Sequence, residues 1–130
     1  MRGSALCTAL LAGLFGAAVA NDIPVTVDRR GFFIEYGEGE KVDHHEAEER
    51  CRRQGRKLAE LREDNEVRVL SRVMSDHRRE IDSDWAWIKD WRGDDFRPRC
   101  VALHDNGKVS DKPGRDCKER GPYICEDERR

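Results

Sequence analysis

The chain has 130 residues, of which 25 are Lys or Arg and 27 are Asp or Glu, so its formal net charge is −2. This is the length of a single domain. The near balance of charge argues against a nucleic-acid-binding protein, which would carry a basic excess. Charged residues make up 40% of the chain. Because both signs are interspersed, they indicate a solvated surface around a modest core, for which covalent cross-links matter.

The first twenty residues have the pattern of a secretory signal peptide. Arg2 supplies a positive charge, residues 5–19 are almost all apolar or small, and Ala18-Val19-Ala20 has the small-x-small form that precedes cleavage. We therefore expect residues 1–20 to be removed and the protein to be secreted. The apolar run is too short and too rich in Gly and Ala for a good membrane span, and no other stretch is a candidate. The alternative is a retained N-terminal anchor.

Four cysteines remain after the leader is removed, because Cys7 lies within it: Cys51, Cys100, Cys117 and Cys125. In a secreted chain an even number of cysteines predicts disulfides rather than free thiols or metal ligands. Four cysteines allow three pairings, and the sequence alone leaves all three open. Two disulfides would support the modest core that so polar a chain can build.

The first half of the mature chain predicts one strand and one helix. Residues 21–30 are interpreted as an N-terminal segment that precedes the domain, and residues 31–36 as a strand. Asp43 is expected to cap a helix that runs to about Gln54 and is stopped by Gly55. Two side chains four residues apart share one face of this helix, namely Ala47 and Cys51.

A second helix and several short strands are expected in the remainder. The helix is expected to begin at a cap on Asp64 or Asn65 and to end near His77. Its apolar residues recur at helical spacing: Val67, Leu70, Val73 and Met74. Asp105-Asn106-Gly107 is a turn of the kind that closes hairpins. The strands are expected at residues 85–88, 100–103, 108–110 and 123–125. A strand, two helices and then short antiparallel strands make an α+β protein.

Six segments of the sequence occur in an order and at spacings that match one known family. They are Ala47-Glu48-Glu49-Arg50-Cys51, Gly55-Arg56-Lys57-Leu58-Ala59, Trp87-Ile88, Cys100-Val101-Ala102-Leu103, Asn106-Gly107-Lys108 and Pro122-Tyr123-Ile124-Cys125-Glu126. Together with the cysteine positions, they resemble the C-type lectin-like domain family. The resemblance runs in register from about Phe32 to Glu126, which is nearly the whole mature chain.

The resemblance implies a C-type lectin-like fold over residues 31–127, followed by a charged tail at residues 128–130. This fold has two helices, short antiparallel strands and two disulfides. The resemblance implies that Cys51 pairs with Cys125 and that Cys100 pairs with Cys117. It also implies an extracellular binding module whose partner is a glycan or a protein.

The sequence departs from this family at the calcium-dependent sugar site. In the family, oxygen ligands come from a proline-containing acid or amide motif in a long loop and from a Trp-Asn-Asp run. Here the loop is compact, since it spans only residues 89–99, and its proline lies between Arg97 and Arg99. The second motif reads Val109-Ser110-Asp111, in which only Asp111 can serve. We therefore expect no cofactor at the usual geometry, with calcium as the alternative.

The candidate binding surface is the stretch of residues 91–97, which combines aromatic, basic and acidic side chains. Aromatic faces stack on sugar rings or fill protein pockets, and arginine pairs with carboxylate or sulfate. The candidate ligand-binding residues are Trp91, Arg92, Asp94, Asp95 and Phe96, together with Asp111.

Three other interpretations of this stretch remain open. In the first, Trp91 or Phe96 covers the core and the charged residues are solvated. In the second, Asp94 and Asp95 hold a cation together with Asp111. In the third, Arg92-Gly93-Asp94 acts as the integrin-binding tripeptide that it spells, although three-letter strings also arise by chance.

Metal-binding and hydrolase chemistry are both disfavoured. His44 and His45 adjoin at the start of the first helix, where neighbouring side chains point about 100° apart and make a poor chelate. They are interpreted as polar residues at a helix end. The serines lack the sequence context of a nucleophile with a nearby base and orienting group. We therefore expect a protein that is not an enzyme.

Three hypotheses follow from these observations. The first is a secreted, non-catalytic C-type lectin-like module that binds a glycan or an extracellular protein without the usual calcium site. The second is a residual calcium-dependent lectin in innate defence. The third is a charged extracellular matrix protein that contacts mineral or polyanion, whose binding would collapse in high salt.

Overall fold

The computed structural model describes residues 21–37, 41–89, 100–111 and 117–128, and of Ser110 and Asp111 it describes the backbone only. Strands and helices are mixed within this part of the chain. They are, in order, β1 (Asp22–Val27), β2 (Arg30–Glu35), α2 (His44–Arg53), β3 (Arg56–Leu58), α3 (Asp64–Asp76), α4 (Arg78–Ile81), β4 (Trp85–Ile88), β5 (Val101–His104), β6 (Val109–Asp111) and β7 (Tyr123–Asp127). The predicted α+β class is confirmed.

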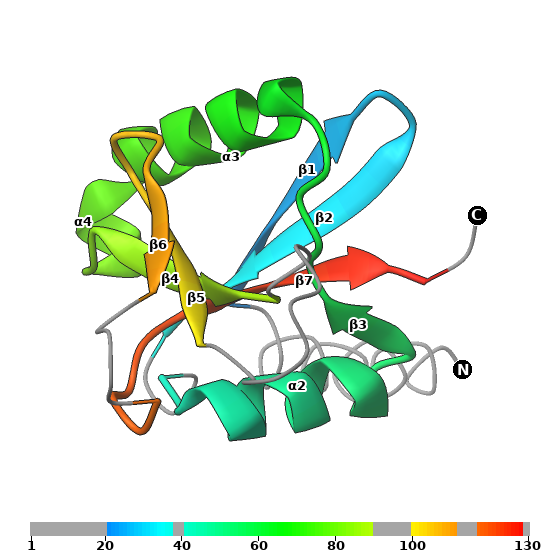
Figure 1. Cartoon of the computed structure of the whole chain (residues 1–130), viewed down its shortest axis with the longest axis vertical. Helices are drawn as coiled ribbons and strands as arrows, with labels where there is room; N and C mark the ends of the chain where they lie inside the picture. The colour runs from blue at the N-terminus through cyan, green and yellow to red at the C-terminus, as the bar shows by residue number, and fades with distance from the viewer. Residues whose placement is uncertain (1–20, 38–40, 90–99, 112–116, 129–130) are drawn as a thin grey trace, which may run out of the picture.

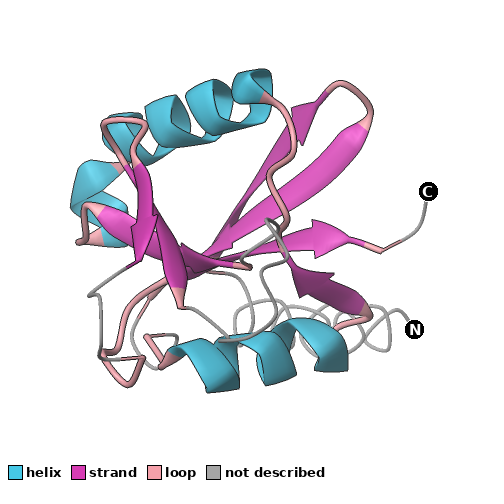
Figure 2. Cartoon of the chain, in the orientation of Figure 1, coloured by secondary structure: helices cyan, strands magenta, loops and turns pink. Residues whose placement is uncertain are grey.

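One sheet runs through the described residues in the order β1-β2-β7-β4-β5-β6, and β3 pairs with β7 beside this path. Neighbouring strands are antiparallel except β4 and β7, which are parallel through Trp87 and Tyr123. Strand β7 therefore joins the hairpin formed by β1 and β2 to the meander formed by β4, β5 and β6. Helices α3 and α2 lie on opposite sides of the strands (Figures 1 and 2).

Both faces of the central strands are buried. Successive residues of a strand point to opposite faces, and all four residues of β4 are buried. Ala86 and Ile88 belong to the cluster that includes Leu70 and Met74 of α3. Trp85 and Trp87 belong to the cluster around α2. The α2-side cluster also contains Val42, Ala47, Cys51, Leu58, Ala102, Tyr123 and Cys125.

Strand β1 is an element that the sequence did not predict, because residues 21–30 were interpreted as a segment before the domain. It pairs along its whole length with β2, from Asp22 opposite Glu35 to Val27 opposite Arg30. Pro24 makes this stretch a weak strand signal, because proline cannot donate to a ladder and is confined to edge positions. β1 is indeed the edge strand of the sheet.

Helix α2 follows the sequence expectation closely. The Asp43 carboxylate accepts a hydrogen bond from the backbone N–H of Glu46 at 2.8 Å, so Asp43 caps the helix as predicted. Gly55, with φ of +76°, ends it in the left-handed region that favours glycine. Ala47 and Cys51 are fully buried, as expected for residues that share the inner face.

Helix α3 begins one residue earlier than predicted, because its cap is Glu63 rather than Asp64 or Asn65. The Glu66 carboxylate, 1% exposed, accepts from the backbone N–H of Arg62 at 2.8 Å and of Glu63 at 3.4 Å. It also pairs with the guanidinium of Arg30 at 2.6 Å. A buried glutamate in the first turn therefore fixes the helix start.

The two disulfides have the pairings that the resemblance implies. Cys51–Cys125, with Cα atoms 5.6 Å apart, joins α2 to β7 inside the core, where both residues are fully buried. Cys100–Cys117, with Cα atoms 5.5 Å apart, lies at the start of β5 and is only half-buried. Within the described residues, no helix is long and apolar enough to cross a membrane.

Candidate functional site

Most of the predicted binding residues lie outside the part of the chain that the structure describes. Trp91, Arg92, Asp94, Asp95 and Phe96 all fall within residues 90–99, which are not described. The backbone of Asp111 is described, and it is the last residue of β6. The site is therefore built here from the strands and anchors to which the segment 90–99 is joined.

The end of β4, the start of β5 and the end of β6 lie side by side, at the point where the predicted binding segment begins and ends. Ile88 at the end of β4 pairs with Val101 at the start of β5, and Val101 pairs with Asp111 at the end of β6. The chain thus enters residues 112–116 beside the point where it returns from residues 90–99. We call this group of strand ends the strand-end platform (Figure 1). It brings Asp111 opposite Val101, the second residue after the segment 90–99.

The residues that flank segments 90–99 and 112–116 are held by a hydrogen bond and by a disulfide. The backbone N–H of Lys89 donates to the carbonyl oxygen of Ala59 at 2.8 Å, immediately before residue 90. Cys100, immediately after residue 99, is linked by its disulfide to Cys117, immediately after residue 116. The hydrogen bond therefore fixes Lys89, the residue before 90–99. The disulfide joins the residue that follows 90–99 to the residue that follows 112–116.

His44 is the residue that connects these anchors. Its ring Nε2 lies 3.1 Å from the carbonyl oxygen of Ile88, and its backbone N–H donates to the carbonyl oxygen of Cys117 at 3.1 Å. The ring also meets Trp87 edge-on, with centroids 5.1 Å apart. The first residue of α2 thus contacts the chain just before residues 90–99 and just after residues 112–116.

Burial gives the imidazole of His44 an unusual protonation equilibrium. Loss of solvation lowers its pKa below the ordinary value of 6.5 and outweighs the opposing hydrogen bond to Ile88 and the nearby carboxylates of Asp43 and Glu48. With Nε2 donating to the Ile88 carbonyl, the neutral ring keeps its proton on that nitrogen. His44 therefore contacts the end of β4 as a neutral imidazole.

From the sequence, His44 is interpreted as a polar residue at a helix end, and its burial is not predicted. The residue is at the start of α2, as expected, but it is 9% exposed. A signal for this was present. Ala47 and Cys51 mark the inner face, and counting back three residues from Ala47 reaches His44 at the same helical phase. His45 is exposed, so the two imidazoles do not face a common point.

Metal ligands do not gather in the part of the chain that the structure describes. No group of three or more His, Cys, Asp or Glu side chains there is arranged to hold an ion. The carboxylates of Asp94, Asp95 and Asp111, which the sequence places together as a possible cation site, are not among the described side chains.

Two tryptophans of β4 pack against each other on the α2 side of the sheet. Trp87 is fully buried, and its indole N–H donates to the carbonyl oxygen of Val42 at 3.1 Å. Trp85 packs against it edge-on, with ring centroids 4.8 Å apart. The buried core thus extends to Ile88, the last residue of β4, in the strand that the aromatic signal of residues 85–88 predicts.

Comparison with known proteins finds no family model and no curated protein that matches this sequence. Among solved structures, a crystal structure of the natural killer cell receptor Ly49C is similar, with a TM-score of 0.57 and 14% sequence identity. The similarity covers 83% of this chain and 93% of that chain. Ly49C contains a C-type lectin-like domain. The chain therefore has the C-type lectin-like fold.

The C-type lectin-like fold confirms the resemblance drawn from the six sequence segments and the four cysteine positions. Identity of 14% shows the fold alone, and a fold does not determine what a protein binds. The ligand therefore has to be inferred from residues of this chain.

Proposed function

We propose that this chain is a secreted, non-catalytic C-type lectin-like binding module that recognises a glycan or an extracellular protein without the usual calcium site. The recognition surface is the segment of residues 91–97, carried on the strand-end platform. The two disulfides support an oxidising, extracellular location. The signal-peptide pattern of residues 1–20 supports secretion.

The observation that carries this proposal is the anchoring of the platform. A binding segment must be held in place if it is to bind without losing much conformational freedom. Here Lys89, just before residues 90–99, is hydrogen-bonded to Ala59, and Cys100, just after them, is cross-linked to Cys117. His44 contacts Ile88 and Cys117. Aromatic and arginine side chains on such a support are the residue types that dominate interfaces.

The composition of the segment supports binding without calcium. A calcium ion takes six to eight oxygen ligands, whereas the proline of this compact loop lies between Arg97 and Arg99. The run that supplies ligands elsewhere in the family retains only Asp111. Cations at positions where ligands are required disfavour a bound divalent ion.

An array of glycans and extracellular proteins, probed with calcium and again with chelator, tests the proposal. We expect at least one ligand to be bound equally in both conditions. The variants Trp91→Ala and Arg92→Ala should weaken this binding tenfold or more, about the 1.4 kcal/mol of an interface anchor. Arg53→Ala, an exposed arginine at the end of α2, serves as the control and should bind like the parent.

Two outcomes would count against the proposal in different ways. Binding that disappears in chelator would favour the residual calcium-dependent lectin. Binding that collapses in high salt and is weakened equally by Arg53→Ala would favour the charged matrix protein, because a diffuse electrostatic contact uses surface arginines interchangeably.

A further inference from the structure

The sheet has one long free edge, which is formed by β1. Among the described strands, β1 pairs with β2 alone and is the outermost strand on its side. The strand at the opposite end of the sheet, β6, has only three residues, whereas β1 has six. A long unpaired edge offers a row of backbone groups to any second strand that lies against it, and natural sheets protect such edges. Strand β1 is therefore the edge at which protection is needed.

The side chains of β1 favour pairing with a further strand. Residues 23–27 read Ile-Pro-Val-Thr-Val, an uncharged run in which every residue except the proline is β-branched. Such residues favour strands, and short uncharged runs of them that lack proline are typical of segments that associate through their edges. Pro24 and Thr26 are exposed. Pro24 is thus the one residue of this run that opposes pairing with a second chain.

The register of the hairpin determines which backbone groups of β1 face outward. In an antiparallel pair, residues that exchange hydrogen bonds with the partner alternate with residues that do not. The backbone N–H and C=O of the second kind point away from the partner strand. The backbone N–H of Tyr36 donates to the carbonyl oxygen of Asn21 at 2.9 Å, in the register that continues with Asp22 opposite Glu35. Positions 21, 23, 25 and 27 therefore face β2, and positions 22, 24 and 26 face outward.

The turn of the hairpin gives the same assignment independently. Asp28 and Arg29 have φ of +48° and +74°, as in the two-residue turn whose flanking residues form a hydrogen-bonded pair. Those flanking residues are Val27 and Arg30, which are opposite each other in the register. Both ends of the hairpin thus place the backbone nitrogen of Pro24 on the free edge, where it has no hydrogen to donate.

Proline at position 24 interrupts the free edge at its centre. The outward N–H groups that remain are those of Asp22 and Thr26, about 13 Å apart at 3.3 Å per residue. A second β1 strand laid antiparallel about Pro24 would lack the two hydrogen bonds at its centre. Each Pro24 carbonyl would face the ring of the other proline and find no donor, and an unsatisfied acceptor removed from water opposes association. The ladder with β2 is unaffected, because the nitrogen of Pro24 does not face it.

We propose that Pro24 determines the specificity of this edge by preventing β1 from pairing with β1 of a second copy of the chain. The free edge is therefore closed to self-association although its side chains favour it. Strands β2 and β7 separate β1 from the strands of the platform. The proposal consequently concerns a different surface from the proposed ligand-binding segment and does not depend on the ligand.

The test is analytical ultracentrifugation of residues 21–130 with both disulfides formed. Pro24→Val restores the outward N–H and completes the β-branched run. We expect the parent to keep the monomer mass up to about 500 µM, whereas the weight-average mass of the variant should rise towards twice that value between about 10 and 500 µM. Pro24→Thr should behave in the same way and serves if the valine variant fails to fold.

Hydrogen exchange identifies the surface that associates. The backbone amide of Thr26 should exchange rapidly in the parent and gain protection with concentration in Pro24→Val, because it faces the second copy only in the variant. Protection of this amide in the monomeric parent would contradict the register from which the proposal is drawn. A dimer of Pro24→Val in which this amide stays unprotected would show that another surface associates and would also overturn the proposal.

Thr26→Val is the matched control, because it adds a valine at the next exposed, outward-facing position of β1 but leaves Pro24 in place. This variant should remain a monomer. Dimerisation of Thr26→Val as strong as that of Pro24→Val would assign the effect to apolar surface rather than to the restored N–H. Monomer mass for both Pro24→Val and Pro24→Thr over the whole concentration range would likewise overturn the proposal.

Discussion

At the scale of single residues, the structure depends on polar groups that are buried with defined partners. His44 is the example closest to the proposed binding surface, because its ring contacts Ile88 and its backbone contacts Cys117. Arg30 is a partly exposed cation whose partners, Glu66 and Glu126, are the buried groups. Its guanidinium joins Glu66 at 2.6 Å and Glu126 at 2.7 Å, and it also donates to the carbonyl oxygen of Glu60 at 3.1 Å.

Acidification is expected to destabilise the protein through His44. Its pKa is lowered in the folded state from the ordinary value of 6.5, so the unfolded chain binds the proton more tightly. The stability due to the neutral ring is therefore present above pH 6.5 and is lost as the pH falls towards the folded-state pKa. The slope contributed by one such group is at most about 1.4 kcal/mol per pH unit.

Urea unfolding between about pH 7 and pH 5 measures this effect. His44→Gln retains an amide that can donate to the Ile88 carbonyl but cannot titrate, so its stability should depend less on pH than that of the parent. His45→Gln changes an exposed neighbour and should follow the parent. Identical slopes for the parent and His44→Gln would show that the ring is not the group responsible.

Removing Arg30 should destabilise the fold by about 2–3 kcal/mol. Glu66 and Glu126, which are 1% and 5% exposed, would each lose the cation that compensates their burial. The value is set below that of a fully buried pair because the Arg30 side chain is 27% exposed. The comparison is Arg62→Ala, which breaks an exposed pair with Glu60 and should cost less than about 1 kcal/mol. Similar losses for the two variants in chemical denaturation would contradict this assignment.

At the scale of elements, local sequence signals and tertiary partners determine different parts of the fold. The limits of α2 were predictable because Asp43 and Gly55 act within one helical turn of the ends they fix. The start of α3 was not, because it depends on Glu66 and on Arg30, which is 36 positions away. Strand β1 was not predictable either, because Pro24 weakens its strand pattern and its pairing with β2 is a tertiary contact.

Deletion of residues 21–28 therefore tests whether β1 is an integral element. Val27 is 3% exposed and belongs to the core cluster on the α3 side. Its loss alone should cost roughly 2 kcal/mol, and the lost ladder with β2 should add to this. Deletion of residues 128–130, which the sequence analysis assigned to a charged tail, is the control and should have little effect. Equal melting temperatures for both truncations would show that the sheet does not require β1.

At the scale of the whole molecule, two disulfides hold together a chain in which 40% of the residues are charged. Cys51–Cys125 spans 74 positions and Cys100–Cys117 spans 17. Loop-closure entropy gives upper estimates of about 4.5 and about 3 kcal/mol for their contributions. The first links α2 to β7 in the core, whereas the second couples the two segments at the strand-end platform.

Paired alanine variants should separate these two roles. Cys51→Ala with Cys125→Ala should destabilise the fold more than Cys100→Ala with Cys117→Ala, both by entropy and because the first pair is fully buried. The second double variant should retain the fold but weaken ligand binding at the platform. Urea unfolding of both variants gives the order of stability, and the reverse order would be inconsistent with these positions in the fold.

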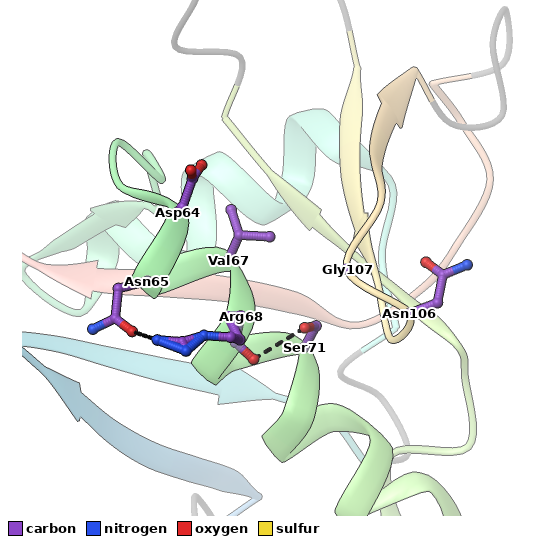
Figure 3. Close-up of a pocket in the computed structure, with 7 residues that line it drawn as sticks. All are labelled: Asp64, Asn65, Val67, Arg68, Ser71, Asn106 and Gly107. Atoms are coloured by element: carbon purple, nitrogen blue, oxygen red, sulfur yellow. Dashed lines mark hydrogen bonds between the residues drawn. The ribbon is translucent and has the colours of Figure 1, made fainter.

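The sequence was most informative about the framework and least about the site. The aromatic run of residues 85–88, the Asp105-Asn106-Gly107 turn and the order of the cysteines led to the correct class and, through the resemblance, to the correct pairings. The hollow between α3 and the β5–β6 turn was not foreseen, because Ser71 and Gly107 come close only when the hairpin folds against α3 (Figure 3). The roles of Trp91, Arg92, Asp94, Asp95, Phe96 and Asp111 in binding remain predictions.

Recognition at the strand-end platform without calcium is most directly tested by the melting temperature of residues 21–130, measured in chelator and in millimolar calcium. An ion that binds only the folded state must raise its stability in proportion to the logarithm of its concentration. The absence of a complete set of oxygen ligands predicts the same melting temperature in both conditions. A rise with calcium that Asp111→Asn abolishes would establish a calcium site and contradict this conclusion.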